Sequence, residues 1–155
     1  MHYQKYYSVD VVNGPGTRCT LFVSGCEHAC KGCYNQATWR CDAGLPFDQT
    51  MVETIINDLN DPRIKRRGLS LSGGDPLHPN NLEAVLDLLQ QVKARTQGKD
   101  IWCWTGYTLN NLSPAQQKVV ELVDVLIDGP FEQELADPSL KWRGSSNQII
   151  HTLSE

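Results

Sequence analysis

Short apolar segments alternate along this chain with longer segments in which apolar residues recur every three or four positions. Residues 20–24, which read Thr-Leu-Phe-Val-Ser, are one short apolar segment and stop at Gly25, as a buried strand does. Similar segments at 68–72, 101–104 and 125–127 predict three further strands. Residues 148–150 are a candidate for a last one.

Three amphipathic helices are predicted between these strands. The first begins at about Asp48, whose carboxylate can cap a helix, and ends at the Asn-Asp-Pro of residues 60–62. The second begins at Asn80 or Asn81, and the third follows the cap and first-turn proline of residues 113–114. Each helix has an apolar face, formed by Met51, Val52, Ile55, Ile56 and Leu59 in the first, Leu82, Val85, Leu86, Leu89 and Val92 in the second, and Val119, Val120 and Val123 in the third.

Apolar strands that alternate with amphipathic helices are typical of a parallel sheet with right-handed crossovers. The chain has 155 residues and is 40% hydrophobic, which suits one domain over residues 1–155. A full eight-unit barrel needs about 250 residues. The predicted fold is therefore α/β, either a small partial (βα) barrel or an open parallel sheet of four to six strands flanked by helices.

Charge and hydropathy exclude several classes of function. No segment reaches the roughly 18 apolar residues of a membrane span, and the start has no signal-peptide pattern. We therefore expect a cytoplasmic protein with no membrane partner. The net charge of −4 and the pI of about 5.5 argue against a nucleic-acid partner.

One short segment runs against the acidic balance of the chain. It holds four cations in five positions, namely Arg63, Lys65, Arg66 and Arg67. Such a run can dock an acidic partner or a nucleotide, but a solvated loop is the favoured interpretation.

Six cysteines without an export signal point to metal binding or burial, because cytosolic thiols stay reduced. Cys26, Cys30 and Cys33 bring three thiols together within eight residues, and soft thiolates select zinc or iron–sulfur. Three cysteines on a cluster of four irons leave one iron open to a chelating small molecule. A structural zinc site instead needs a fourth ligand, for which Cys19, Cys41 and His28 are the candidates. The spacing favours iron–sulfur and leaves zinc open.

The other distinctive residues also follow predicted strands, where the chemistry of parallel α/β proteins lies. Gly73-Gly74-Asp75-Pro76 follows the second strand, although on its own it reads as an ordinary strand-to-helix turn. Asp128 ends the fourth strand and either faces a ligand or accepts from turn amides. Cys19 and Cys103 lie among apolar neighbours and are expected to be buried, whereas Cys41 is undecided.

The two motifs together resemble the radical S-adenosylmethionine enzymes, because Cys-x3-Cys-x2-Cys follows a first strand and the double glycine a second. Four further segments narrow the resemblance to the anaerobic ribonucleoside-triphosphate reductase activating proteins, nearly from end to end; they are residues 13–18, 32–35, 104–107 and 142–148. Two positions depart from the wider superfamily. Gly32 stands where an aromatic is usual, with Tyr34 displaced, and Asp75 replaces a glutamate.

This resemblance implies an enzyme that reductively cleaves S-adenosylmethionine and generates a glycyl radical on the reductase. Its implied partners are the large subunit of that reductase and a low-potential electron donor such as flavodoxin. It implies a [4Fe–4S] cluster on Cys26, Cys30 and Cys33, and contacts to S-adenosylmethionine from Gly32, Cys33, Tyr34, Gly73, Gly74 and Asp75. The alternatives are an activase of another glycyl radical enzyme and a non-catalytic zinc-bound interaction module.

Overall fold

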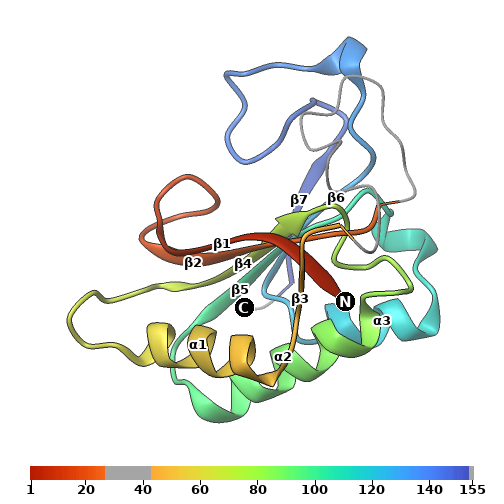
Figure 1. The fold of residues 1–155 in the computed structure, drawn as a ribbon. Helices are drawn as coiled ribbons and strands as arrows, with labels where there is room; N and C mark the ends of the chain where they lie inside the picture. The colour runs from red at the N-terminus through yellow and green to blue at the C-terminus, as the bar shows by residue number, and fades with distance from the viewer. Residues whose placement is uncertain (27–42, 154–155) are drawn as a thin grey trace.

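A computed structural model describes residues 1–26 and 43–153 of the chain. Its centre is a seven-stranded sheet in the order β3-β1-β2-β4-β5-β6-β7 (Figure 1). The strands are β1 (His2–Asp10), β2 (Arg18–Val23), β3 (Leu45–Pro46), β4 (Gly68–Gly73), β5 (Asp100–Trp104), β6 (Val125–Asp128) and β7 (Ile149–Thr152).

The four middle strands, β2, β4, β5 and β6, are parallel. Their starts are in register, since Arg18 pairs with Gly68 and Gly68 with Asp100. Their carboxyl ends therefore meet at one edge of the sheet, and the predicted α/β class with an open sheet is confirmed.

The sheet exceeds the expected four to six strands because antiparallel strands extend both of its sides. β1 pairs with β2 and β3, and β7 pairs with β6, all antiparallel. β1 was not predicted, because its sequence mixes tyrosines with polar residues and has no apolar run. In the segment between β6 and β7 the structure has a 3₁₀ turn, η3 (Gln133–Leu135), and no crossover α-helix. The chain therefore returns antiparallel.

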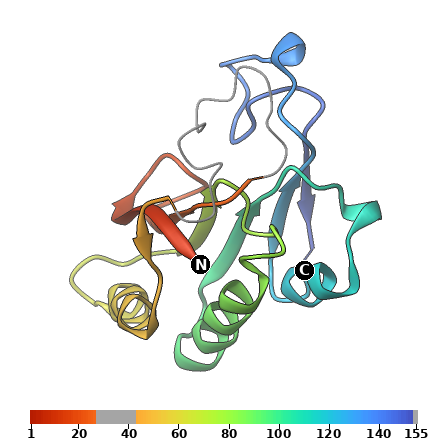
Figure 2. The same cartoon turned by 45° about the vertical axis from the view of Figure 1, so that its right-hand side comes forward.

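The helices α1 (Gln49–Asn60), α2 (Leu82–Arg95) and α3 (Pro114–Val120) lie on one face of the sheet (Figure 2). All three predicted starts are confirmed, because the residues that precede the helices are Asp48, Asn81 and Ser113. The Asp48 side chain accepts from the Met51 amide, and Ser113 forms a capping box with Gln116. None of the described helices is long and apolar enough to cross a membrane.

Alternation along the strands gives the sheet two different faces. Leu69, Leu71 and Cys103 belong to the apolar core with the helices. Their neighbours Ser70 and Trp102 therefore point to the opposite face, which is covered by loops. Ser70 Oγ donates to the Asn13 carbonyl at 2.6 Å, and Trp102 packs with Trp142.

Arg18 is fully buried at the start of β2 on this second face. It donates to Asp100 Oδ1 at 2.6 Å, Ser70 Oγ at 2.7 Å and the Pro15 carbonyl at 3.2 Å. The guanidinium also lies over the Trp102 ring. A buried charge is stable only with such partners. Through them Arg18 joins β2, β4 and β5 to the loop of residues 11–17.

The cationic run is only in part a solvated loop. Arg63, Lys65 and Arg67 are exposed as expected. Arg66 is buried instead, and its guanidinium donates to the carbonyls of Ser8 and Asp58. The prediction of a solvated side chain is wrong for Arg66. Its long side chain reaches carbonyls of β1 and α1 that are distant in the sequence, and a local pattern does not reveal such partners.

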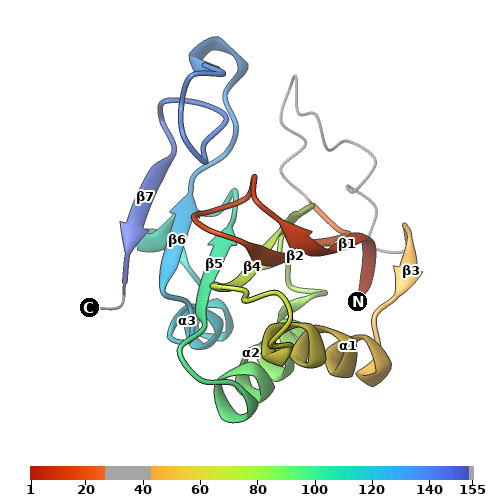
Figure 3. The ribbon, with the colours of Figure 1, turned by 90° about the vertical axis from the view of Figure 1, so that its left-hand side faces the viewer.

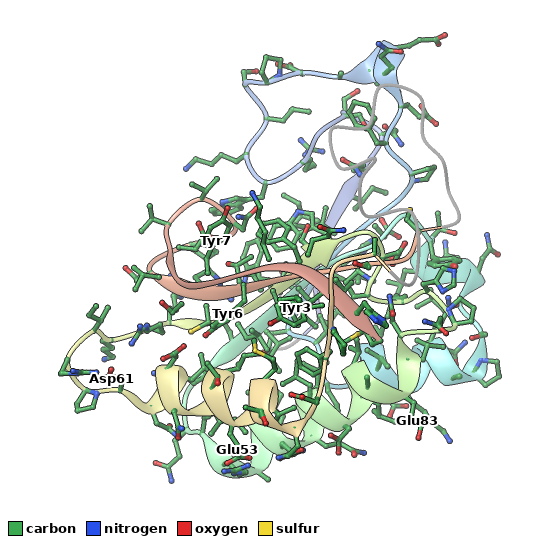
Figure 4. All side chains as sticks on the ribbon, viewed as in Figure 1. Tyr3, Tyr6, Tyr7, Glu53, Asp61 and Glu83 are labelled. Atoms are coloured by element: carbon green, nitrogen blue, oxygen red, sulfur yellow. The ribbon has the colours of Figure 1, made fainter. Side chains whose placement is uncertain are left out.

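Cys19 and Cys103 are both buried, as predicted. Burial raises the pKa of each thiol, for Cys103 well above its ordinary value. Tyr6 lies beside Cys19 between the sheet and α1 (Figure 4), where its hydroxyl donates to Asp58. Burial raises the pKa of this hydroxyl as well.

Because these thiols are buried, the free energy of unfolding is expected to vary with pH in the alkaline range. Unfolded cysteines ionise above about pH 8.5, while the buried thiols stay protonated, so the free energy of unfolding is expected to fall as the pH rises from about 8.5 to 10. The slope that one such thiol contributes approaches about 1.4 kcal/mol per pH unit. Urea unfolding of the wild type and Cys103→Ala at several pH values measures it; equal slopes in the two proteins would contradict this origin.

Candidate functional site

A cavity of about 470 Å³ lies where the carboxyl ends of β4 and β5 meet the segment that follows β6. Figure 3 shows that segment, residues 129–148, rising beyond the end of β6. The described lining residues include Val12, Asn13, Cys26, Ser72, Gly73, Gly74, Trp104, Thr105, Gly106, Phe131, Trp142, Arg143 and Gln148.

Cys26 lies at the wall of this cavity, three residues after β2. The chain that leads to it is held in place, because the Asp75 amide donates to the Gly25 carbonyl at 2.7 Å. Ser24 Oγ donates to the Ala43 carbonyl and so joins the two ends of the intervening segment. Six residues that the sequence singled out lie outside the described residues. They are the predicted cluster ligands Cys30 and Cys33, the predicted S-adenosylmethionine contacts Gly32 and Tyr34, and the undecided His28 and Cys41.

The predicted Gly73 and Gly74 both line the cavity. Gly73 has φ +102°, and a Cβ there would lie 2.5 Å from the Val23 carbonyl oxygen. The Gly74 amide donates to that same oxygen at 2.7 Å. A glycine is thus needed at position 73 because β2 and β4 approach closely beside the cavity. The spacing of motifs in the sequence did not reveal this structural reason for the glycine.

Asp75 is fully buried beneath the cavity and is not among its lining residues. Its Oδ1 accepts from the Thr105 hydroxyl at 2.7 Å and the Leu77 amide at 2.9 Å, and its Oδ2 accepts from the Gly106 amide at 2.9 Å. The side chain therefore joins the turn after β4 to the turn after β5.

Asn81 also holds this region together, although the sequence indicated only that a helix begins at Asn80 or Asn81. It forms no side-chain cap bond with α2. Its buried amide instead donates to the carbonyls of Ser24 at 2.8 Å and Asp75 at 2.9 Å. The sequence carries no signal for this role, because the carbonyl of Ser24 is 57 positions away.

Aromatic residues form the wall on the side of residues 129–148. Trp104 Nε1 donates to the Trp142 carbonyl at 2.6 Å, and Trp142 packs edge-on against Trp102. Trp142 has φ +59°, a conformation that a side chain this bulky adopts only where its surroundings enforce it. The Gln148 side chain closes the segment by donating to the Gly129 carbonyl and accepting from the Gly144 amide.

Asp128 has a structural role. It is buried, its Oδ2 accepts from the Leu109 amide at 2.7 Å, and its Oδ1 lies 2.9 Å from His151 Nε2. Of the two interpretations left open, the turn-amide one is supported, and Asp128 is not among the lining residues of the cavity.

The described part of the site fits an iron–sulfur cluster. Its thiol is a soft donor at the end of a strand, and the charged lining side chains, Lys141 and Arg143, are both cationic. They complement the negative charge that several thiolates would bring. Residues 1–26 and 43–153 by themselves hold no group of three metal-binding side chains, so any cluster also needs ligands from the segment between.

Residues 12–151 match the family model described as "4Fe-4S single cluster domain". The chain is thus a protein of the single-cluster iron–sulfur class.

Relatives over nearly the full length define the family more narrowly. The chain is 63% identical to the anaerobic ribonucleoside-triphosphate reductase-activating protein of Escherichia coli, covering 99% of each chain. It is 64% identical to that of Vibrio cholerae, covering 97% of each, and 46% identical to that of enterobacteria phage T4, covering 97% of this chain and 93% of the relative. The chain belongs to the family of anaerobic ribonucleoside-triphosphate reductase-activating proteins, which confirms the resemblance seen in its motifs.

Proposed function

We propose that this protein reductively cleaves S-adenosylmethionine and thereby generates a glycyl radical on an anaerobic ribonucleoside-triphosphate reductase. The observation that carries the proposal is the meeting of Cys26 with Gly73 and Gly74 in one cavity, in a chain of the activating-protein family. The zinc-module alternative has no support, since the matching domain is a 4Fe–4S one. An activase of another glycyl radical enzyme is likewise not favoured by the relatives.

In this proposal Cys26, Cys30 and Cys33 hold a [4Fe–4S] cluster whose remaining iron is open to the amino and carboxylate groups of S-adenosylmethionine. The bound cluster supplies one electron at low potential. Gly32, Cys33, Tyr34, Gly73 and Gly74 contact S-adenosylmethionine, and Asp75 belongs to the same subsite.

The electron breaks the bond between sulfur and the 5′-carbon, which leaves methionine and a 5′-deoxyadenosyl radical. That radical takes a hydrogen atom from a glycine of the reductase large subunit, giving 5′-deoxyadenosine and a glycyl radical. The chain positions the reactants and keeps water away from them. Trp104, Phe131 and Trp142 provide an apolar wall for that purpose.

The proposal includes the setting of the reaction. Residues 1–155 act as a single radical S-adenosylmethionine domain in the cytoplasm, and a low-potential donor such as flavodoxin supplies the electron. One continuous sheet through the described residues supports a single domain.

Paramagnetic resonance of the reduced, anaerobically purified protein tests the first half of the proposal. We expect a cluster signal that changes when S-adenosylmethionine is added, and methionine as a product. Mixing with the reductase is then expected to give a glycyl radical signal on the reductase. A colourless protein with one zinc and no iron would refute the proposal, and so would a cluster signal that S-adenosylmethionine leaves unchanged.

A further inference from the structure

Arg143 lies in the cavity wall with one edge of its guanidinium group unpartnered. Its Nη1 donates to the Gln148 carbonyl at 2.9 Å. Its Nε is buried and has no hydrogen-bond partner among the described residues. In a guanidinium group, Nε and Nη2 form a side edge that binds the two oxygens of a carboxylate in parallel. Because a buried donor without a partner costs free energy, this edge indicates a ligand that the described residues do not supply.

The charge around this edge is positive. Lys141 also lines the cavity, and none of the described lining residues carries a carboxylate. Three acidic residues of the same segment, Glu132, Glu134 and Asp137, are exposed and are not among the lining residues. A positive wall with an unpartnered guanidinium edge fits a ligand that carries an anionic group.

Arg143 lies on the side of the cavity away from Cys26. The chain that enters Cys26 is bonded to the turn after β4, through the Gly25 carbonyl. The Gln148 carbonyl that binds Arg143 immediately precedes β7, which is three strands from β4. Neighbouring strands are about 4.8 Å apart, so these two places are separated by roughly 14 Å. The carboxylate of S-adenosylmethionine, which the proposed function puts on the cluster, is therefore not the expected ligand of Arg143.

Exposed valines beside the same cavity indicate that the ligand is part of a protein. Val11 and Val12 are 70% and 72% exposed, and Val12 lines the cavity. Their loop is held in place, because the Val12 amide donates to Asp10 Oδ1 at 3.0 Å and the Asn13 carbonyl accepts from Ser70 Oγ at 2.6 Å. Apolar side chains that are held exposed beside a cavity are typical of a surface that a partner protein covers.

Resting on the proposed function, we propose that Arg143 binds a carboxylate on the reductase segment that carries the glycine. The carboxylate accepts from Nε and Nη2 of Arg143, and apolar residues of the segment cover Val12. This contact holds the segment across the cavity in which S-adenosylmethionine is cleaved. Arg143 is therefore a binding residue for the protein substrate, and the affinity for the reductase depends on it.

The experiment measures the dissociation constant between the cluster-loaded protein and the reductase by anaerobic titration calorimetry. The dissociation constant for S-adenosylmethionine and the melting temperature are recorded for each variant. Arg143→Gln is expected to weaken reductase binding on the order of 10- to 100-fold. Arg143→Lys keeps the charge but not the planar edge, and it is expected to weaken reductase binding at least about fivefold.

Arg63→Gln is the matched control. It makes the same change of charge at a side chain that is 86% exposed and is paired with Asp61. Arg63 precedes β4, at the end of the parallel strands away from the cavity. Because exposed ion pairs contribute little, this variant is expected to bind the reductase within about twofold of wild type.

Substitutions in the reductase identify the carboxylate and leave this chain intact. Each Asp or Glu of the segment around the glycine is replaced in turn by Asn or Gln. One of these substitutions is expected to weaken binding to the wild-type protein on the order of 10- to 100-fold. The same substitution is expected to weaken binding to Arg143→Gln by no more than about twofold, because the pair is already broken.

Three results would overturn the inference. The first is that no carboxylate of the segment couples to Arg143, and the second is that Arg63→Gln weakens reductase binding as much as Arg143→Gln. The third is an equal weakening of S-adenosylmethionine and reductase binding by Arg143→Gln, which would place Arg143 in the cofactor subsite. A wild-type protein that binds the reductase through this pair but does not cleave S-adenosylmethionine would instead refute the proposed function and leave the contact standing.

Discussion

Replacing Cys26 with alanine is expected to abolish the cleavage of S-adenosylmethionine. Cys26 lies at the cavity wall, and the proposed cluster has only three protein ligands, so the loss of one thiolate leaves a second iron without a protein donor. Losing a group that only hydrogen-bonds to a metal ligand lowers metal affinity or activity roughly 10- to 100-fold. Losing the ligand itself is therefore expected to lower activity by more than about 100-fold. Iron content and methionine production per protein measure the effect.

Cys103→Ala is the control for this substitution. Cys103 is a cysteine on the parallel strand β5, and it is fully buried in the core with the helices. Its replacement is expected to leave the cluster in place and to cost on the order of 1 kcal/mol of stability. Full iron content and cleavage in Cys26→Ala would show that Cys26 is not a ligand.

Replacing Gly73 with alanine is expected to destabilise the whole fold. The residue has φ +102°, and the added Cβ would lie 2.5 Å from the Val23 carbonyl oxygen and 2.6 Å from the Val23 nitrogen. Backbone strain and the forced separation of β2 and β4 together are expected to cost at least about 3 kcal/mol. For a chain of this size that lowers the melting temperature by roughly 6–12 °C.

Gly98→Ala separates strain from crowding. Gly98 also has a positive φ, +68°, but a Cβ there meets nothing within 4 Å. Its replacement is expected to cost only about 1 kcal/mol, or roughly 2–4 °C. Melting curves of the two variants give the comparison. A Gly73→Ala protein that melts together with Gly98→Ala would contradict the close approach of the two strands.

The parallel part of the fold was predictable because its signals are local. Residues 69–72 alternate leucine and serine between a core face and a loop-covered face, and the buried strand is observed at β4. Asp48 and Ser113 cap their helices as expected. β1 was missed because its polar and aromatic residues become a strand only by pairing with β2.

The candidate site was predictable by residue type but not by role. Cys26, Gly73 and Gly74 meet at one cavity, as strand ends in a parallel sheet must. The roles of Asp75 and Asn81 depend on partners 30 and 57 positions away. No local pattern distinguishes such residues from an ordinary turn acid or helix cap.

The amino-acid sequence alone was sufficient to determine the alternation of strands and helices, the density of thiols after the first parallel strand, and the activating-protein family. Each of these depends on residues that are close together in the sequence. Only the tertiary structure could decide that Arg18 and Arg66 are buried, that Asp75 joins the two sides of the cavity, and that Gly73 permits two strands to touch. Those outcomes depend on which distant groups are brought within hydrogen-bond reach, and packing decides that.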